Sequence, residues 1–274
     1  MGSGIAAAVA KVGLPVTLAD VDDAALARGF ERVEAQFRRL VRSGQLDERD
    51  ARAARDRISG STKLDDVAGV ADYVIETVVE DLATKTAVLR QLDAACRPDV
   101  VLASNTSQFS ISRLAAATGR PDRVIGSHWF NPPTAMPLIE LVRGVETSDQ
   151  TLAVALELAG RFEKQTIICQ KDTPGFITSR LIALLMIEAA RIVDEGIASV
   201  EDVNSACVLG FGHAQGPLDT ADASGLDTLV HVADALREQY GDRFLVPQNL
   251  RALYSAGHFG RKTGRGFSLN ETKT

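Results

Sequence analysis

Short β-rich runs alternate with helical stretches over the first 170 residues or so, and this alternation restricts the fold more than any other feature. Strands joined through helices form a parallel sheet whose faces the helices cover. The predicted strands are 15–19, 73–75, 100–103, 124–127, 138–142 and 165–169, and the predicted helices between them are 2–12, 22–42, 81–96 and 148–162. Residues 1–171 are therefore expected to form an α/β, Rossmann-like domain.

The remainder of the chain has a different pattern, with one helical stretch after another. Pro174 and Gly175 mark the boundary, and the predicted helices are 177–194, 200–209, 226–239 and 249–256. We expect residues 172–274 to form an all-α domain. The apolar run 181–187 is more hydrophobic than one small helical domain needs, so we expect it to pack on the first domain or on a second subunit of a homodimer.

Residues 22–56 are longer than a minimal crossover between two strands. They hold a long helix and then a second one that begins near Leu46–Asp50, which predicts a helical hairpin standing out from the sheet. Two interpretations remain open. The hairpin is a charged, solvated insertion, or it offers Arg38, Arg39 and Arg42 to a phosphate-bearing ligand.

Composition restricts the partners and the compartment. The net charge of -6 argues against a nucleic-acid-binding surface, which needs clustered basic residues. Cys96, Cys169 and Cys207 lie far apart without metal-type spacing, so we predict neither a metal site nor a disulfide framework. Such cysteines indicate a reducing compartment. The longest apolar run falls short of the roughly 20 residues that span a bilayer. We expect a soluble, cytoplasmic protein that binds no membrane.

The segment from Gly126 to Val142 holds the candidate for chemistry. His128 ends a predicted strand, and Glu140 follows twelve residues later among apolar neighbours. A histidine whose second ring nitrogen is held by a buried carboxylate is an effective general base, because the carboxylate fixes the tautomer and stabilises the imidazolium. The alternative is a hydrogen-bonded structural histidine and a strand glutamate that faces water.

At the amino terminus, a helix that opens on Gly2 precedes a strand that ends at Asp20. This arrangement matches the second half of a dinucleotide-binding unit, in which the acidic residue binds the adenosine ribose and favours NAD over NADP. The strand and Gly-x-Gly turn of the first half do not precede Gly2. We therefore expect this chain to begin at an internal methionine of a longer protein and, as written, to bind NAD more weakly than an extended version.

Several motifs together resemble the NAD-dependent L-3-hydroxyacyl-CoA dehydrogenase family, especially its short-chain 3-hydroxybutyryl-CoA members. They occur in the family's order over nearly the whole chain: Met1–Ala6, Val74–Glu80 with Lys85, Ala103–Ser107, His128–Pro133, Glu140, Asp172–Ile177 and Gly264–Phe267.

The resemblance implies a role for each matching residue. His128 is similar to the general base, Glu140 to its orienting partner, Ser107 to the serine that hydrogen-bonds the substrate oxygen, and Asn131 to a residue that braces the site. It implies an NAD site lined by Gly2, Asp20, Glu80, Lys85 and Asn105. Asn105–Ser107 and Glu80 also suit helix starts. The family has an asparagine where this chain has Ser179, which we take as a possible substrate-binding residue.

Three functions remain open at this point. The constellation favours oxidation of a short-chain L-3-hydroxyacyl-CoA, such as 3-hydroxybutyryl-CoA, or the reverse reaction. A second possibility is a related dehydrogenase of a free hydroxy acid of the carnitine or gulonate type. The third is a catalytically silent remnant that lacks the start of its cofactor site.

Overall fold

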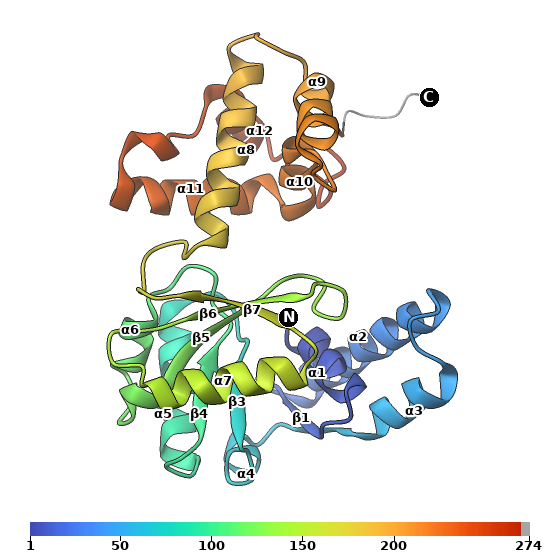
Figure 1. The fold of residues 1–274 in the computed structure, drawn as a ribbon, viewed down its shortest axis with the longest axis vertical. Coiled ribbons are helices and arrows are strands. Elements are labelled where there is room, and N and C mark those ends of the chain that lie inside the picture. Colours follow the sequence, from blue (N-terminus) through green and yellow to red (C-terminus); the bar gives the residue numbers. More distant parts are fainter. Residues whose placement is uncertain (270–274) are drawn as a thin grey trace. The chain divides into compact units, whose positions relative to one another are not determined.

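The computed structural model describes residues 1–269 and divides the chain into two compact units, Met1–Thr173 and a second that begins at Pro174 (Figure 1). Each unit has its own layers and its own core. Among the described residues, no helix combines the length and the apolar character that crossing a membrane requires.

The first unit alternates helices and strands, as predicted. In chain order its elements are α1 (Gly2–Lys11), β1 (Val16–Ala19), α2 (Asp23–Arg42), α3 (Glu48–Asp56), β2 (Ile58–Ser61), α4 (Leu64–Ala68), β3 (Tyr73–Glu76), α5 (Leu82–Ala95), β4 (Val101–Ser104), α6 (Ile111–Ala115), a 3₁₀ turn (Pro121–Arg123), β5 (Val124–Trp129), β6 (Leu138–Val142), α7 (Asp149–Arg161) and β7 (Gln165–Cys169).

The strands of this unit form two sheets. β1 and β2 pair in parallel, and β3, β4, β5, β6 and β7 form a five-stranded sheet in that order. Within the described residues, β1 therefore has a hydrogen-bonded neighbour on one edge only, and so does β3. Sequence reasoning missed β2, because Ile58-Ser-Gly-Ser61 holds one apolar residue and no alternation.

One strand pair departs from the predicted parallel arrangement. β5 and β6 run antiparallel, with Gly126 opposite Val142 and His128 opposite Glu140. Parallel neighbours need a crossover of about a dozen residues or more, whereas residues 130–137 form a short link that holds no helix. The short link therefore forces the chain to reverse.

The predicted helical hairpin is present as α2 and α3 (Figure 1). Side chains of Asp22 and Asp47 accept hydrogen bonds from backbone N–H groups in the first turns of these helices, which fixes where both helices begin. Phe37 of α2 belongs to a core cluster with Ala51 and Ala54 of α3 and with small residues of α1. The small alanine side chains let the three helices approach closely.

The second unit is all helical. Its elements are α8 (Thr178–Asp194), α9 (Val200–Ser205), a π-helical turn (Ala206–Gly210), α10 (Pro217–Ser224), α11 (Leu226–Tyr240), a 3₁₀ turn (Asp242–Phe244) and α12 (Gln248–Ser255). Their apolar faces share one core, which includes Ile187, Leu218 and Phe244. Sequence reasoning missed α10, whose start at Pro217 follows a Gly-rich stretch.

Buried Asp222 fastens the end of the described chain to this bundle. Its carboxylate accepts hydrogen bonds from the backbone N–H groups of Phe267 and Ser268 at 2.9 and 2.8 Å. A Cβ added at Gly266 would lie 1.9 Å from the Asp222 Oδ1 atom, so only glycine fits there.

The close packing of β5 can be tested at Gly126. A Cβ at this position would lie 2.8 Å from Ile111 Cδ1 and 2.8 Å from Val142 Cβ, so Gly126→Ala should destabilise the first unit by about 1–3 kcal/mol. Urea unfolding followed by the fluorescence of Trp129, the single tryptophan, measures this change. The control is Gly160→Ala on α7, where the added Cβ meets open space and should stabilise by about 0.5–1 kcal/mol. Equal unfolding midpoints for the two variants would contradict the expectation.

Candidate active site

The antiparallel pairing of β5 and β6 brings the two candidate residues for acid–base chemistry together. His128 Nδ1 lies 2.9 Å from Glu140 Oε2, and the two residues are 8% and 0% exposed. A buried carboxylate needs a hydrogen-bonding partner, and here the partner is the imidazole. Nδ1 then carries the proton that it donates to Glu140, so Nε2 becomes the basic nitrogen of the neutral ring.

The side chain of Asn105, which follows β4, links β4 to β5, and β5 is called the histidine strand because it carries His128. Asn105 Oδ1 accepts a hydrogen bond from the backbone N–H of Trp129 at 2.8 Å, immediately after His128. The Asn105 N–H in turn donates to the Glu76 carbonyl at 2.8 Å. Asn105 thus bridges the carboxyl ends of β3, β4 and β5, and the adjacent Ser107 lies at the same edge of the sheet.

Glu80 and Lys85 follow β3 and contact each other. Lys85 Nζ lies 3.1 Å from Glu80 Oε2 and 3.0 Å from Glu76 Oε1. The Lys85 side chain is 1% exposed, whereas that of Glu80 is 31% exposed. Of this pair, both predicted to line the cofactor site, Glu80 has accessible surface and Lys85 is buried.

Asn131 lies in the link between β5 and β6, with an exposed side chain and a cis peptide bond to Pro132. Lys164 Nζ holds this link, because it donates to the carbonyls of Pro133 and Met136 at 2.7 Å each. Burial lowers the pKa of this ammonium. The contacts keep Asn131 close to the end of the histidine strand.

The amino end of α1 lies beside the loops that follow β3 and β5. A Cβ at Gly2 would lie 2.6 Å from Thr77 Oγ1, and one at Gly4 would lie 2.9 Å from Pro133 Cδ. The helix N-terminus, with its outward N–H groups, therefore lies at the edge where the candidate residues gather. Glycine at position 2 permits this close approach.

Asp20 lies just after β1 and is exposed, and its carboxylate accepts a hydrogen bond from the Val21 N–H at 2.9 Å. An acidic residue at a strand end and a helix N-terminus near the carboxyl edge of a sheet are two of the features of a dinucleotide site, and a strand with a Gly-rich turn before the helix is the third. The residues of this unit thus fit an NAD molecule.

Ser179 belongs to the second unit, where it is half-buried in the first turn of α8. The structure thus brings together His128, Glu140, Asn105, Ser107, Asn131, Glu80 and Lys85 within the first unit.

Cysteine chemistry is disfavoured at this edge of the sheet. Burial raises the pKa of the Cys169 thiol, and the carboxylates of Glu140 and Asp172 raise it further. A nucleophilic cysteine needs the opposite environment, because the thiolate is the reactive form. The imidazole–carboxylate pair therefore remains the candidate for acid–base chemistry in this region.

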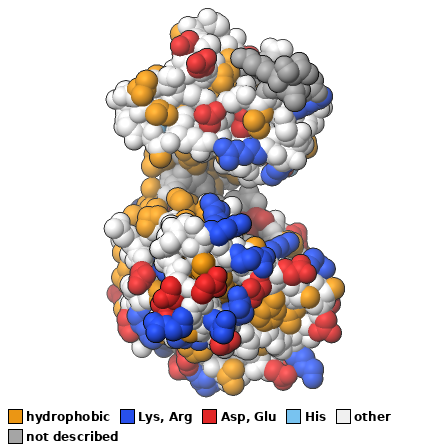
Figure 2. Space-filling model, turned by 90° about the vertical axis from the view of Figure 1, so that its right-hand side faces the viewer, with side chains coloured by type: hydrophobic (Ala, Val, Ile, Leu, Met, Phe, Trp, Pro, Cys, Tyr) orange, Lys and Arg blue, Asp and Glu red, His pale blue; other side chains and the backbone are white. Residues whose placement is uncertain are grey.

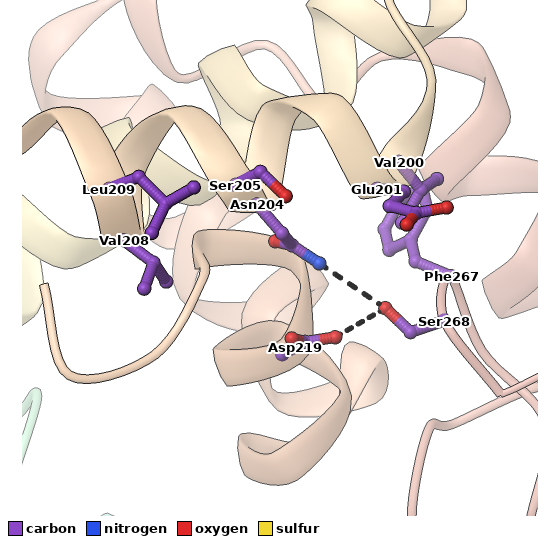
Figure 3. A pocket seen from close by; sticks show the side chains of 9 residues that line it. All are labelled: Val200, Glu201, Asn204, Ser205, Val208, Leu209, Asp219, Phe267 and Ser268. Carbon is purple, nitrogen blue, oxygen red and sulfur yellow. Dashed lines mark hydrogen bonds between the residues drawn. The ribbon is translucent and has the colours of Figure 1, made fainter.

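A separate cavity of about 520 Å³ lies in the second unit, lined by residues of α9, the π-helical turn, α10 and the chain end (Figure 3). The side chains of Asn204, Ser268 and Asp219 form a hydrogen-bonded row along it. None of the predicted site residues lines this cavity. The polar groups that line this cavity bond to one another.

Sequence reasoning missed the buried residues Glu76, Ser104 and Thr106. Glu76 accepts hydrogen bonds from Lys85 and Ser104, and Thr106 donates to Glu80. A signal was present for Glu76. It ends an apolar β-rich run, and a carboxylate in such a run needs a cation, which Lys85 supplies from the next helix. The hydroxyls of Ser104 and Thr106 gave no signal apart from ordinary turn chemistry.

Family models match both units. A model described as "3-hydroxyacyl-CoA dehydrogenase, NAD binding domain" matches residues 1–173, and one described as "3-hydroxyacyl-CoA dehydrogenase, C-terminal domain" matches residues 175–269.

Relatives match over nearly the whole chain. A probable 3-hydroxybutyryl-CoA dehydrogenase of Bacillus subtilis is 40% identical over 275 residues, which cover 100% of this chain and 95% of the relative. A 3-hydroxybutyryl-CoA dehydrogenase of Mycobacterium tuberculosis is 39% identical, covering 97% of this chain and 94% of the relative. The crystal structure of (S)-3-hydroxybutyryl-CoA dehydrogenase from Ralstonia eutropha superposes with a TM-score of 0.93 at 41% identity, covering 99% and 96% of the two chains.

The hydrogen bond between His128 and Glu140 predicts the tautomer of the neutral imidazole. Nitrogen-15 NMR of the folded protein should find the His128 proton on Nδ1, because only that nitrogen faces the carboxylate. In Glu140→Gln the carboxamide can rotate to donate as well as accept, so the two tautomers should both be populated. His128→Gln, which removes this ring alone among the four histidines, identifies its signals. A proton on Nε2 in the unsubstituted protein would overturn the arrangement.

Proposed function

The chain belongs to the 3-hydroxyacyl-CoA dehydrogenase family, and from this premise we propose that it interconverts a short-chain L-3-hydroxyacyl-CoA and the 3-ketoacyl-CoA with NAD. The substrate pair is 3-hydroxybutyryl-CoA and acetoacetyl-CoA. The observation that carries the proposal is the buried His128–Glu140 pair, at 2.9 Å, at the sheet edge where α1 and Asn105 lie.

His128 is the general base of this reaction. Its Nε2 takes the proton of the 3-hydroxyl, and the imidazolium that forms is stabilised by the Glu140 carboxylate on Nδ1. When bound, NAD accepts the hydride from C3. In the reverse direction the imidazolium returns its proton to the 3-oxygen of the ketone.

Ser107 and Asn131 orient the substrate. The Ser107 hydroxyl donates to the 3-oxygen, where charge develops as proton and hydride leave together, and a rigidly placed donor lowers the cost of this change. Asn131 braces the site from the link that Lys164 holds. Ser179, with a shorter side chain than asparagine, binds substrate from α8.

The cofactor is held by the residues of the first unit. The N-terminus of α1 with Gly2 takes the pyrophosphate, Asp20 accepts hydrogen bonds from the adenosine ribose, and Glu80 and Asn105 line the remainder of the site. Lys85 acts on this site through Glu80, because its own side chain is buried.

Arg38, Arg39 and Arg42 favour a CoA ester over a free hydroxy acid. All three side chains are exposed near the end of α2. On the side of the first unit where α2 and α3 lie, basic and acidic side chains are intermixed (Figure 2), so no single basic field covers this face. Recognition of the CoA phosphates therefore rests on these local arginines rather than on general charge.

The enzyme acts in fatty acid metabolism in the cytoplasm. The acyl-CoA substrate supports the first assignment. Three free thiols, at Cys96, Cys169 and Cys207, are buried without disulfide bonds, which suits a reducing compartment.

The reaction can be tested with His128→Gln. NADH oxidation with acetoacetyl-CoA should fall about 10²- to 10⁴-fold in kcat, because glutamine cannot exchange the proton, while NADH binding stays close to normal. His231→Gln is the matched control, since this exposed ring contacts only Tyr254 among the interactions described for it. Unchanged activity in His128→Gln would remove the proposed base.

The assembly is a homodimer formed through the second unit. Leu209 and Phe211 at the π-helical turn are 85% and 73% exposed, which is unusual for large apolar side chains so close together in sequence. Light scattering should give twice the chain mass of 29.3 kDa, and Leu209→Glu/Phe211→Glu should give the single mass. Val145→Glu, at another exposed apolar residue in the first unit, should remain dimeric. A monomeric wild type would refute the dimer, and a dimeric double variant would exclude this surface.

A further inference from the structure

Glu76, the last residue of β3, has a fully buried carboxylate that accepts hydrogen bonds from every side. Val78 N–H donates to Oε1 at 2.7 Å, Ser104 Oγ donates to Oε2 at 2.6 Å, and Lys85 Nζ donates to both oxygens at 3.0 and 3.2 Å. With its acceptor positions used and its side chain 0% exposed, this carboxylate has no surface to offer to a ligand. Its contacts identify it as an anchor.

Lys85 links the fixed carboxylate of Glu76 to that of Glu80. The ammonium lies between the two carboxylates, and its remaining contact is the Val78 carbonyl at 3.5 Å. Two carboxylates and one ammonium leave a net charge of one negative, which the neutral donors of Val78 and Ser104 help to satisfy. Removing a charged partner leaves an uncompensated buried charge, and removing a neutral donor leaves an unsatisfied oxygen, so the geometry is strongly held.

Glu80 in turn holds the loop that follows β4. Its Oε1 accepts hydrogen bonds from Thr106 Oγ1 at 2.5 Å and from the Ser107 N–H at 3.0 Å. Thr106 Oγ1 also accepts from the Phe109 N–H at 2.9 Å, which shapes the next turn of the loop. The backbone of Ser107 is thus fixed by a carboxylate that is itself fixed by Lys85.

We propose that Glu76 is a positioning residue, which acts through Lys85 and Glu80 to set the place of Ser107 at the end of the histidine strand. The set of Glu76, Lys85, Glu80 and Thr106 is called the carboxylate clamp. The inference rests on the proposed function only where Ser107 is taken to bind the substrate oxygen. The arrangement of the clamp itself is independent of the reaction.

The carboxylate is essential to the clamp because an amide of the same shape cannot replace it. Four donor contacts converge on the two oxygens of Glu76, whereas glutamine offers one oxygen and an NH₂ group that is itself a donor. In Glu76→Gln, some of these donors lose their acceptor, and the Lys85 ammonium moves towards Glu80. Loosening should therefore spread to Thr106 and Ser107.

Hydrogen exchange tests the clamp without any turnover. In Glu76→Gln, the backbone amides of the segment 104–110 should exchange about tenfold faster or more, because Glu80 and Thr106, which accept from the Ser107 and Phe109 N–H groups, are no longer held in place through Lys85. Glu188→Gln removes a surface carboxylate that pairs with Arg191 on α8 and should leave this segment unchanged. Unchanged exchange in a folded Glu76→Gln variant would overturn the proposal.

Thr106→Val tests the contact of the clamp between Thr106 and Glu80. It tests the positioning role even if Glu76→Gln does not fold. Valine keeps the shape and removes the hydroxyl, so kcat/KM for acetoacetyl-CoA should fall about 10- to 100-fold, with KM raised and one NADH still bound per chain. Thr106→Ser restores the hydroxyl and should recover most of this loss.

Thr118→Val, which deletes a hydroxyl bonded to the Ala115 carbonyl at 2.8 Å, is the matched control. A merely structural defect would lower the number of NADH sites at unchanged KM, and this result or unaltered kinetics in Thr106→Val would refute the positioning role. An inactive wild type would instead count against the proposed function, and the exchange measurement would still decide on the clamp.

Discussion

The antiparallel ladder between β5 and β6 is the constraint on which the candidate site depends. It places His128 directly opposite Glu140, so that a carboxylate with no exposed surface meets an imidazole at 2.9 Å. A register shift of one residue would turn Glu140 to the other face of the sheet and break its hydrogen bond with His128. The short link 130–137 enforces the reversal, and the same link carries Asn131. One topological feature therefore fixes the proposed base, its partner and a neighbouring polar group together.

The other side of the site depends on a second buried carboxylate at a strand end. Glu76 holds Lys85, Lys85 holds Glu80, and Glu80 holds the loop of Ser107. Asn105 then joins this loop to the backbone at Trp129. Because these contacts connect the ends of β3, β4 and β5, the polar groups are held by the sheet itself rather than by flexible loops. Such rigidity is what the orientation of a reacting oxygen requires.

Local sequence patterns predicted the sequence of helices and strands, the helical hairpin and the change to an all-helical second half, because each depends on periodicity, caps and breakers. They did not predict β2, since Ile58–Ser61 has the composition of a turn and becomes a strand only by pairing with β1. Nor did they predict the direction of β6, which depends on how short a link can be and not on the strand's own residues. Local sequence patterns also did not predict that Lys85 is buried. Its burial depends on Glu76 and Glu80 converging from outside its helix.

Glu76 and Glu140 look alike in the sequence, as single carboxylates in apolar runs, yet their partners give them different consequences. Glu140 faces an imidazole, which carries charge only when it is protonated, so in the proposed reaction the attraction between the two groups is stronger after His128 has taken the substrate proton. Glu76 faces an ammonium that is held between two carboxylates throughout, so its attraction does not change along the reaction. The first arrangement can favour proton transfer, and the second can only hold geometry. The partner, rather than the carboxylate, decides which of these roles a buried glutamate has.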